Sequence, residues 1–302
     1  MYEIVIIGAG TAGLTAAVYG CRAGRRVLLL EENIYGGQIV NAAEVENYPG
    51  IPQISGYEFA ENLYRQATEL GAEFRYEKVH KIEVQGKEKT VVTNRQKYTA
   101  KAVILATGAK NRHLGIAREE ELIGKGVSYC AACDGAFYRG RDVAVVGGGN
   151  TALEDAQFLA GICRSVYLIH RRKHFRGEDR LLQKLRKKEN VHLVLDSEVV
   201  GLEGEERLAF VAVRRTDTKE EQILPVAGLF IAIGQIPDNH AFSSLVNLDE
   251  NGYIQALEDC RTSAEGIFAA GDCRTKEVRQ LATAAADGAV AALAACRAED
   301  DV

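Results

Sequence analysis

The sequence predicts an α/β protein with two Rossmann-like dinucleotide-binding domains, each with a parallel sheet and a three-stranded β-meander. A glycine-rich loop that follows a strand and opens a helix occurs twice, at residues 8–13 and 147–152. In each copy a second strand ends 23 positions after the first glycine, at Glu31 and at His170. This repetition favours two copies of one dinucleotide-binding unit over one large domain. The length of 302 residues agrees, because domains average roughly 150 residues.

The first copy starts with a β-branched run that is typical of a buried strand, and an Ala-rich helical stretch follows its glycine loop. A second strand comes next. Three segments of alternating apolar and polar residues then predict a three-stranded β-meander that ends at Gly108. The predicted elements lie at residues 4–7, 14–23, 26–30, 79–85, 89–94 and 97–105.

The second copy repeats this plan and ends at Gly234. Its predicted elements lie at residues 143–146, 153–160, 165–169, 191–202, 207–215 and 221–233. The chain after Gly234 contains one more predicted strand, at 266–270, and a long Ala-rich helix at 280–296.

Composition and charge exclude several classes of protein. A net charge of −5 argues against general nucleic-acid binding. No stretch reaches the roughly 18 uncharged apolar residues of a membrane helix, and the N-terminus lacks the basic leader of a signal peptide. We therefore expect a cytoplasmic protein with no membrane or nucleic-acid partner. Its seven cysteines are then expected to be reduced, unless a pair has a redox task.

Both glycine loops suit a pyrophosphate. Glycines let the backbone approach the phosphates, and the helix N-terminus that follows offers free N–H groups and the positive end of its dipole. Ordinary tight turns are the alternative, and the strand–loop–helix context argues against them. Ala152 replaces the third glycine of the second loop, a variant that this motif tolerates.

The residue at the end of the second strand distinguishes the two sites. Glu31 is an acceptor that suits a ribose with a free 2′-hydroxyl, as in FAD or NAD. The second copy has His170, Arg171 and Arg172 at this place, with Arg176 close behind. Guanidinium groups bind a 2′-phosphate bidentately, so this site is predicted to bind NADPH. A solvated basic helix face is the alternative for these arginines.

A Cys-x-x-Cys pair, Cys130 and Cys133, lies shortly before the second loop. A structural zinc site needs a second ligand pair, which the sequence does not offer, so no metal is predicted. Two inert buried thiols are another alternative. A redox disulfide fits best, because one thiolate of such a pair often has a depressed pKa. Asp134 follows directly and is placed to exchange the proton that dithiol–disulfide interconversion requires.

These three features form an electron path. NADPH gives up two electrons as hydride, whereas a protein disulfide is a poor hydride acceptor. A flavin accepts hydride and passes the electron pair to sulfur, which makes FAD the better choice for the Glu31 site. The residues alone thus predict an NADPH:FAD:disulfide reductase.

The chain also resembles the bacterial-type (low molecular weight) thioredoxin reductases, of class II of the pyridine nucleotide-disulfide oxidoreductases, over essentially its full length. The segments that carry the resemblance are 8–13, 36–38, 44–50, 106–108, 126–135, 147–152, 170–176, 271–272 and 279–280. The resemblance implies a discontinuous FAD-binding domain, residues 1–113 and 245–302. It implies an inserted NADPH-binding domain, residues 114–244, that carries the Cys-x-x-Cys pair.

The resemblance also assigns site residues. The resemblance implies that Cys133 lies next to the flavin, that Cys130 exchanges with thioredoxin and that Asp134 is the acid/base. Positions that match FAD contacts are Gly8, Gly10, Gly13, Glu31, Gly37, Gln38, Asn47, Thr107, Gly108, Asp272, Gln280, Leu281 and Ala282. Positions that match NADPH contacts are Gly147, Gly149, Asn150, Thr151, His170, Arg171, Arg172 and Arg176.

By this resemblance we expect a thioredoxin reductase that acts as a homodimer and rotates its NADPH domain during turnover. One alternative is a related reductase that serves another thioredoxin-fold or peroxiredoxin partner. An NADPH oxidase that forms hydrogen peroxide is a second alternative, although it would not require the cysteine pair. A non-catalytic flavin redox sensor is a third.

Overall fold

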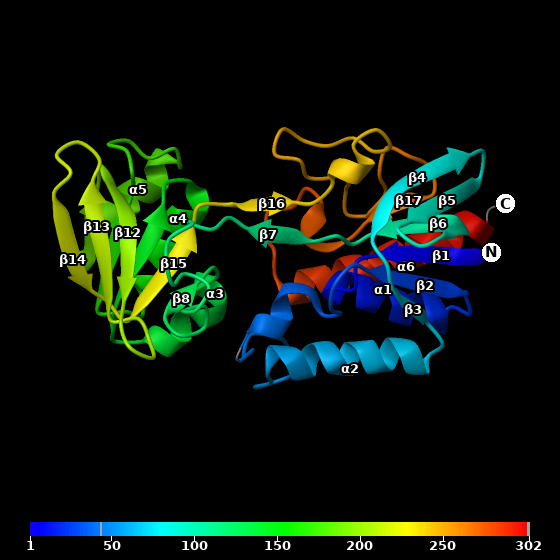
Figure 1. Cartoon of the computed structure of the whole chain (residues 1–302), viewed down its shortest axis with the longest axis horizontal. Coiled ribbons are helices and arrows are strands. Elements are labelled where there is room, and N and C mark those ends of the chain that lie inside the picture. Colours follow the sequence, from blue (N-terminus) through cyan, green and yellow to red (C-terminus); the bar gives the residue numbers. More distant parts are fainter. Residues whose placement is uncertain (43, 301–302) are drawn as a thin grey trace. The chain divides into compact units, whose positions relative to one another are not determined.

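The computed structural model of the chain describes residues 1–42 and 44–300, so the last two residues of the predicted FAD-binding segment lie outside it. The chain forms two compact units (Figure 1). The first unit comprises Met1–Lys110 and Ile236–Val302, and the second comprises Asn111–Gln235.

The chain leaves the first unit at Lys110 and returns to it at Ile236, whereas the sequence predicted 113 and 245. The return comes earlier because Phe242, in the short helix η3 (His240–Phe242), packs into the core of the first unit. The two passages between the units are β7 (Ala109–Asn111) and β16 (Gln235–Pro237), which form a two-stranded sheet.

The first unit is built on a seven-stranded sheet of order β3-β2-β1-β6-β5-β4, with β17 also paired to β6. Its strands are β1 (Tyr2–Ile7), β2 (Val27–Glu31), β3 (Glu73–Tyr76), β4 (Val79–Gln85), β5 (Glu88–Thr93), β6 (Lys97–Leu105) and β17 (Ile267–Ala269). The first part of β6 pairs antiparallel with β5, and its last three residues pair parallel with β17. The meander and the parallel sheet are therefore continuous through β6.

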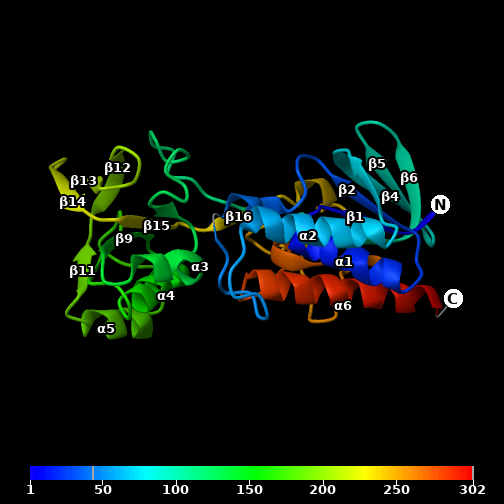
Figure 2. The ribbon, with the colours of Figure 1, turned by 90° about the horizontal axis from the view of Figure 1, so that it is seen from below.

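Three helices cover one face of this sheet: α1 (Thr11–Arg22), α2 (Gly56–Glu69) and α6 (Leu281–Asp300). Figure 2 shows α1 between α2 and α6. Small residues let α6 approach α1 closely, since a Cβ at Gly288 would lie 2.2 Å from the carbonyl oxygen of Ala12. Two short helices, η1 (Gly37–Asn41) and η4 (Gly271–Cys273), lie in loops of this unit.

Within α6, residues Leu281–Ala298 are long and apolar enough to cross a membrane, judged by length and composition alone. A core helix of a soluble protein passes the same test. This stretch contains Asp287 and Arg297, so it is not the uncharged run that the sequence excluded. Asp287 is buried and paired with Arg274 and Lys276, which is the environment of a core helix.

The second unit has a five-stranded parallel sheet of order β11-β10-β9-β15-β8 and a separate three-stranded antiparallel sheet, β12-β13-β14. Its strands are β8 (Val127–Ser128), β9 (Asp142–Gly147), β10 (Ser165–Ile169), β11 (Val191–Val194), β12 (Ser197–Glu203), β13 (Phe210–Arg215), β14 (Glu221–Pro225) and β15 (Gly228–Ala232). Its helices are α3 (Ala131–Asp134), η2 (Gly135–Tyr138), α4 (Asn150–Leu159) and α5 (Asp179–Arg186). One face of the parallel sheet packs on the α-helices and the other on the antiparallel sheet.

Two predicted strands of the second unit, 191–202 and 221–233, are wrong as single elements, because each is two strands. The first is interrupted at Asp196, whose φ of 48° is left-handed. The second is interrupted where the backbone changes sheets: Val226 N–H donates to Ala209 of the antiparallel side, and Ala227 N–H donates to Asp142 of β9. Apolar residues continue across the second break, at Val226 and Ala227, so the sequence did not reveal it. At the first break, Leu195 and Asp196 fit the alternation of apolar and polar residues that is typical of a strand.

Candidate active site

The loop between β1 and α1 contains glycines of two kinds. A Cβ at Gly13 would lie 1.8 Å from the carbonyl oxygen of Gly8, so packing within the protein requires glycine there. At Gly10 the nearest heavy atom to a Cβ, the oxygen of Gly36, would be 3.9 Å away. The fold itself thus does not demand glycine at this position. Helix α1 begins directly after it with no side-chain cap and no acidic residue in its first turn, which leaves its N-terminus open to an anion.

Glu31 ends β2 beside this loop. Its Oε2 accepts a hydrogen bond from the backbone N–H of Ala9 at 2.8 Å, and its Oε1 accepts from that of Asn33 at 3.0 Å. These bonds fix the carboxylate next to the glycine loop, and each oxygen keeps acceptor capacity for a ribose hydroxyl.

Four groups of the predicted FAD residues follow the carboxyl ends of parallel strands. The glycine loop follows β1, Glu31 closes β2, Thr107 and Gly108 follow β6, and Asp272 follows β17. Because these strands run parallel, the groups meet at one edge of the sheet, which is where open α/β sheets bind ligands.

Asp272 has an unsatisfied atom at this edge. Its Oδ1 is buried and has no hydrogen-bond partner among the described residues, and burial raises the pKa of its carboxyl group. A buried acceptor without a partner is costly. A ligand hydroxyl would satisfy it, so the residues present fit a flavin dinucleotide.

The remaining predicted FAD residues lie in nearby segments of the first unit. The side chain of Gln38, in η1, donates to the carbonyl oxygen of Ala109. Asn47 donates to Gln280 at 3.2 Å, just before α6 begins at Leu281 and Ala282. Gly37 lies at the start of η1, where a Cβ would be 3.2 Å from the Cα of Gly10.

Thr107 is held by a residue that the sequence did not identify. Its hydroxyl donates to the side-chain oxygen of Asn239 at 2.8 Å. Asn239 is fully buried and donates in turn to the carbonyl oxygens of Gly252 and Cys273. The sequence does not reveal this contact, because Asn239 lies 132 residues from Thr107 and only the fold brings the two together.

The loop between β9 and α4 repeats the pattern of the first loop. A Cβ at Gly147 would lie 2.3 Å from the carbonyl oxygen of Ala232, whereas a Cβ at Gly149 would meet nothing within 4 Å. Helix α4 begins at Asn150 and Thr151 without a side-chain cap. The middle glycine of each motif is thus the one with open space, as a backbone that contacts phosphate requires.

The ring of His170 makes several contacts within the second unit. Its ring is buried, stacks on Phe175 with centroids 4.9 Å apart, and contacts the carbonyl oxygen of His174 at 3.1 Å. It also lies where a Cβ of Gly148 would fall, 2.0 Å away. Burial, and then the neighbouring arginines, lower the pKa of His170. The ring therefore packs against the glycine loop in surroundings that disfavour its protonated form.

The segment after His170 folds back onto the glycine loop. The backbone N–H groups of Arg176 and Gly177 donate to the carbonyl oxygen of Gly148 at 2.7 and 3.1 Å. The side chain of Asn150 bonds to Glu178, both accepting from its backbone and donating to its carboxylate. Arg171, Arg172 and Arg176 are all exposed on this segment. In the part of the chain that the structure describes, none of these three forms an ion pair.

Cys130 and Cys133 form a disulfide at the start of α3. The backbone N–H of Cys133 donates to the sulfur of Cys130 at 3.2 Å, and both cysteines are half-buried. Across residues 1–42 and 44–300, no group of His, Cys, Asp and Glu is arranged to hold a metal ion.

Asp134 ends the same helix, close to the disulfide in sequence. Burial raises the pKa of its carboxyl group, and a hydrogen bond from Ser128 opposes this rise. The Ser128 hydroxyl lies 2.6 Å from Oδ2 of Asp134. A carboxyl group with a raised pKa is suited to exchange protons near neutral pH. The sequence did not identify Ser128, because a lone serine at a strand end carries no pattern.

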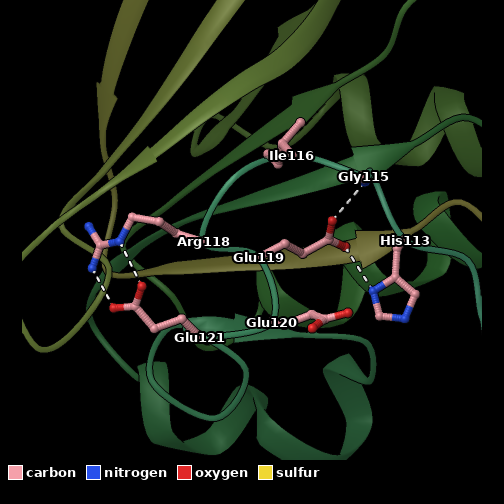
Figure 3. A pocket seen from close by; sticks show the side chains of 7 residues that line it. All are labelled: His113, Gly115, Ile116, Arg118, Glu119, Glu120 and Glu121. Carbon is pink, nitrogen blue, oxygen red and sulfur yellow. Dashed lines mark hydrogen bonds and ion pairs between the residues drawn. The ribbon is translucent and has the colours of Figure 1, made fainter.

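A cavity of about 370 Å³ lies nearby in the second unit (Figure 3). Its most buried side chain, Glu119, accepts from the backbone N–H groups of Leu114 and Gly115 and from the hydroxyl of Tyr129. Both oxygens of Glu119 are thus used within the protein. Glu119 thus holds Tyr129, the residue before Cys130. We assign no ligand to the cavity.

Comparisons with known proteins identify the family of the chain. The family model for pyridine nucleotide-disulphide oxidoreductases matches residues 2–289. The chain is 44% identical over 293 residues to a thioredoxin reductase of Listeria innocua, covering 96% of this chain and 92% of the relative. It is 41% identical to a thioredoxin reductase of Bacillus subtilis, with 97% and 93% coverage. The crystal structure of a thioredoxin reductase from Streptococcus pyogenes superposes with a TM-score of 0.96 at 39% identity, covering 100% and 99% of the two chains.

Proposed function

Since the chain belongs to the pyridine nucleotide-disulphide oxidoreductase family, we propose that it passes electrons from NADPH through FAD and the Cys130–Cys133 disulfide to thioredoxin. The protein is an NADPH-dependent flavoprotein disulfide reductase, a thioredoxin reductase. The observation that carries the path through these cysteines is the disulfide itself, which is followed directly by the half-buried acid Asp134 in the unit that also bears the arginine segment.

FAD binds to the first unit in this proposal. Gly8, Gly10 and Gly13 receive its pyrophosphate, Glu31 accepts from a ribose hydroxyl, and Asp272 accepts from a further hydroxyl. Support comes from the open space at Gly10, the placed carboxylate of Glu31 and the unpartnered Oδ1 of Asp272. The other contributors are Gly37, Gln38, Asn47, Thr107, Gly108, Gln280, Leu281 and Ala282. When bound, FAD accepts two electrons as hydride and delivers them to sulfur.

NADPH binds to the second unit in this proposal. Gly147, Gly149, Asn150 and Thr151 form the pyrophosphate loop, and Arg171, Arg172 and Arg176 bind the 2′-phosphate. The exposed, unpaired guanidinium groups support this role, because bidentate bonds to phosphate are available to them. His170 is also part of this site, and the packing of its ring on Phe175 and on the glycine loop supports a role in holding the loop.

Electrons leave the protein by dithiol–disulfide exchange with thioredoxin. Two electrons and two protons convert the disulfide into the thiols of Cys130 and Cys133. The Cys130 thiolate attacks the disulfide of thioredoxin and forms a mixed disulfide. Cys133 attacks Cys130, which restores the internal disulfide and releases thioredoxin with two thiols. Asp134 gives and takes the proton of the thiol that reacts.

Three further features belong to this proposal. The nicotinamide site and the cysteines lie on the same unit, Asn111–Gln235, so rotation of this unit would let them alternate at the flavin. The protein acts as a homodimer in the cytoplasm, with no nucleic-acid or membrane partner. Its net charge of −5 is consistent with the absence of a nucleic-acid partner.

Purified protein tests the proposal. We expect NADPH oxidation that depends on oxidised thioredoxin, one dithiol formed for each NADPH consumed, and little oxidation when oxygen is the only acceptor. A rate with oxygen equal to that with thioredoxin would indicate an oxidase. Reduction of another thioredoxin-fold protein or a peroxiredoxin, but not of thioredoxin, would identify a related reductase.

A further inference from the structure

Ser128 connects the disulfide to the acid. It is a buried serine, 4% exposed, in β8, whose pairing with β15 fixes its backbone. Its hydroxyl donates to Oδ2 of Asp134 at 2.6 Å and accepts from the backbone N–H of Cys130 at 3.0 Å. One side chain therefore holds both the residue before α3 and the residue that ends it.

Asp134 relies on this contact for its position and its charge. In the described part of the chain, Ser128 is the one side chain that donates to its carboxylate. Burial raises the pKa of Asp134 and the Ser128 hydrogen bond lowers it. Neither Glu154 nor Asp155, on the helix α4 that packs against α3, contributes to this shift.

Tyr138 of η2 is the other titratable group near Asp134. Burial raises the pKa of Tyr138, and the charge of Asp134 raises it further. Arg207 and Arg141 act on Tyr138 in the opposite direction. Tyr138 does not contribute to the pKa shift of Asp134, so a change in the Asp134 titration that follows loss of the Ser128 hydroxyl is attributable to that hydroxyl.

We propose that Ser128 is a positioning residue. Its hydroxyl stays hydrogen-bonded to Asp134 in both protonation states of that carboxyl group and so holds it in place at the end of α3. This inference rests on the proposed role of Asp134 as the acid/base of disulfide exchange. Ser128 touches no reacting sulfur in this role and acts through Asp134.

The Ser128 hydroxyl can bond to Asp134 in both protonation states, because a hydroxyl group can donate or accept a hydrogen bond. When Asp134 is a carboxylate, the Ser128 O–H donates to it, as in the structure. When Asp134 is protonated, its own O–H donates to Ser128 Oγ, and the serine proton turns to the carbonyl oxygen of Cys130, 3.4 Å away. Ser128 keeps its proton throughout, so the proton moves only between Asp134 and the reacting thiol.

The test compares Ser128→Thr with Ser128→Val, two variants of equal shape that differ in the hydroxyl. The readout is the pH–rate profile of thioredoxin reduction by the pre-reduced holoenzyme. The limb of this profile that reports the titration of Asp134 is the one that disappears in Asp134→Asn. We expect this limb to lie about one pH unit higher in the valine variant than in the threonine variant, because the lost hydrogen bond to the charged carboxylate is stronger than the one that the neutral acid makes. Ser197→Ala is the matched control, because Ser197 is also buried and donates to a backbone oxygen, that of Leu195.

Equal limbs in the two variants would overturn the inference, as would an equal shift in Ser197→Ala. If both larger side chains prevent folding, Ser128→Ala adds no volume and is compared with wild type in the same way. A carboxyl carbon NMR titration of Asp134 in the same proteins separates this inference from the proposed function. Its pKa must rise without the hydroxyl even if thioredoxin is not the substrate.

Discussion

The two glycine loops are alike at the middle position of the motif and differ at the end of the strand that follows. Gly10 and Gly149 both leave open space at the middle position of the motif. At the end of the next strand, the first unit presents the carboxylate of Glu31, whereas the second buries His170 and presents exposed arginines beyond it. In the proposed function, one loop geometry thus serves two dinucleotides and the residues at the strand end distinguish them.

The third motif position shows how tightly each loop packs on its helix. In the first unit a Cβ at Gly13 would lie 1.8 Å from a backbone oxygen. In the second unit Ala152 carries a Cβ at the matching position and is fully buried without displacing the loop. The same motif therefore has a strict glycine in one unit and a tolerant position in the other.

The largest expected effect tests the difference at the strand ends. Arg171→Ala with Arg172→Ala should lower kcat/KM for NADPH about 10²-fold or more and spare NADH, because two or three charge-assisted hydrogen bonds to the 2′-phosphate are lost. Steady-state kinetics with both nucleotides measure the ratio. Arg186→Ala with Lys187→Ala removes two exposed cations at the end of α5 and is the control. An unchanged NADPH/NADH ratio would refute the phosphate site.

A smaller effect tests the difference at the third motif position. Gly13→Ala should force the loop and α1 apart, with a cost of about 1–3 kcal/mol and loss of bound FAD. Ala152→Gly should cost only about 1 kcal/mol, the difference in helix propensity, and leave FAD content unchanged. Thermal unfolding and the flavin content of purified protein measure both. Full retention of FAD by Gly13→Ala would contradict the close packing of this loop.

The smallest effect concerns the matched position one turn further along each helix. Ala16 is fully buried in α1, whereas α4 has Asp155, whose pKa burial raises to about 7. Because this pKa is higher in the folded state than the ordinary value near 3.9, the contribution of Asp155 to stability is largest at low pH and is lost as pH rises toward 7.

Asp155→Asn should therefore raise Tm relative to wild type by a few degrees at pH 8 and leave it nearly unchanged at pH 4. Glu189→Gln removes an exposed carboxylate of the same unit and should show no such trend. A constant Tm difference from pH 4 to pH 8 would mean that Asp155 titrates normally.

The sequence predicted the features that depend on spacing along the chain. The glycine loops, Glu31, the arginine segment and the Cys130–Cys133 pair each follow from position within a repeated strand–helix–strand plan. These patterns are local, because a phosphate loop needs its glycines, its helix and its second strand at fixed offsets.

The sequence could not predict features that depend on how distant segments meet. Ser128 matters because β8 places it against Asp134, and Asn239 matters because a returning segment places it under Thr107. The contact of His170 with nucleotide stays a prediction from its offset and from the family resemblance, but the packing of its ring on Phe175 and the glycine loop depends on tertiary structure. The break at 226–227 was missed because apolar residues continue across a change of sheet.

The central claim is that electrons reach thioredoxin only through the disulfide of the second unit. Cys130→Ser tests it most directly, in a rapid-mixing experiment that follows flavin absorbance and thioredoxin reduction together. We predict that NADPH still bleaches the flavin of this variant, because neither dinucleotide site is altered, while thioredoxin turnover falls at least about 10³-fold. Undiminished thioredoxin turnover in Cys130→Ser would contradict the account.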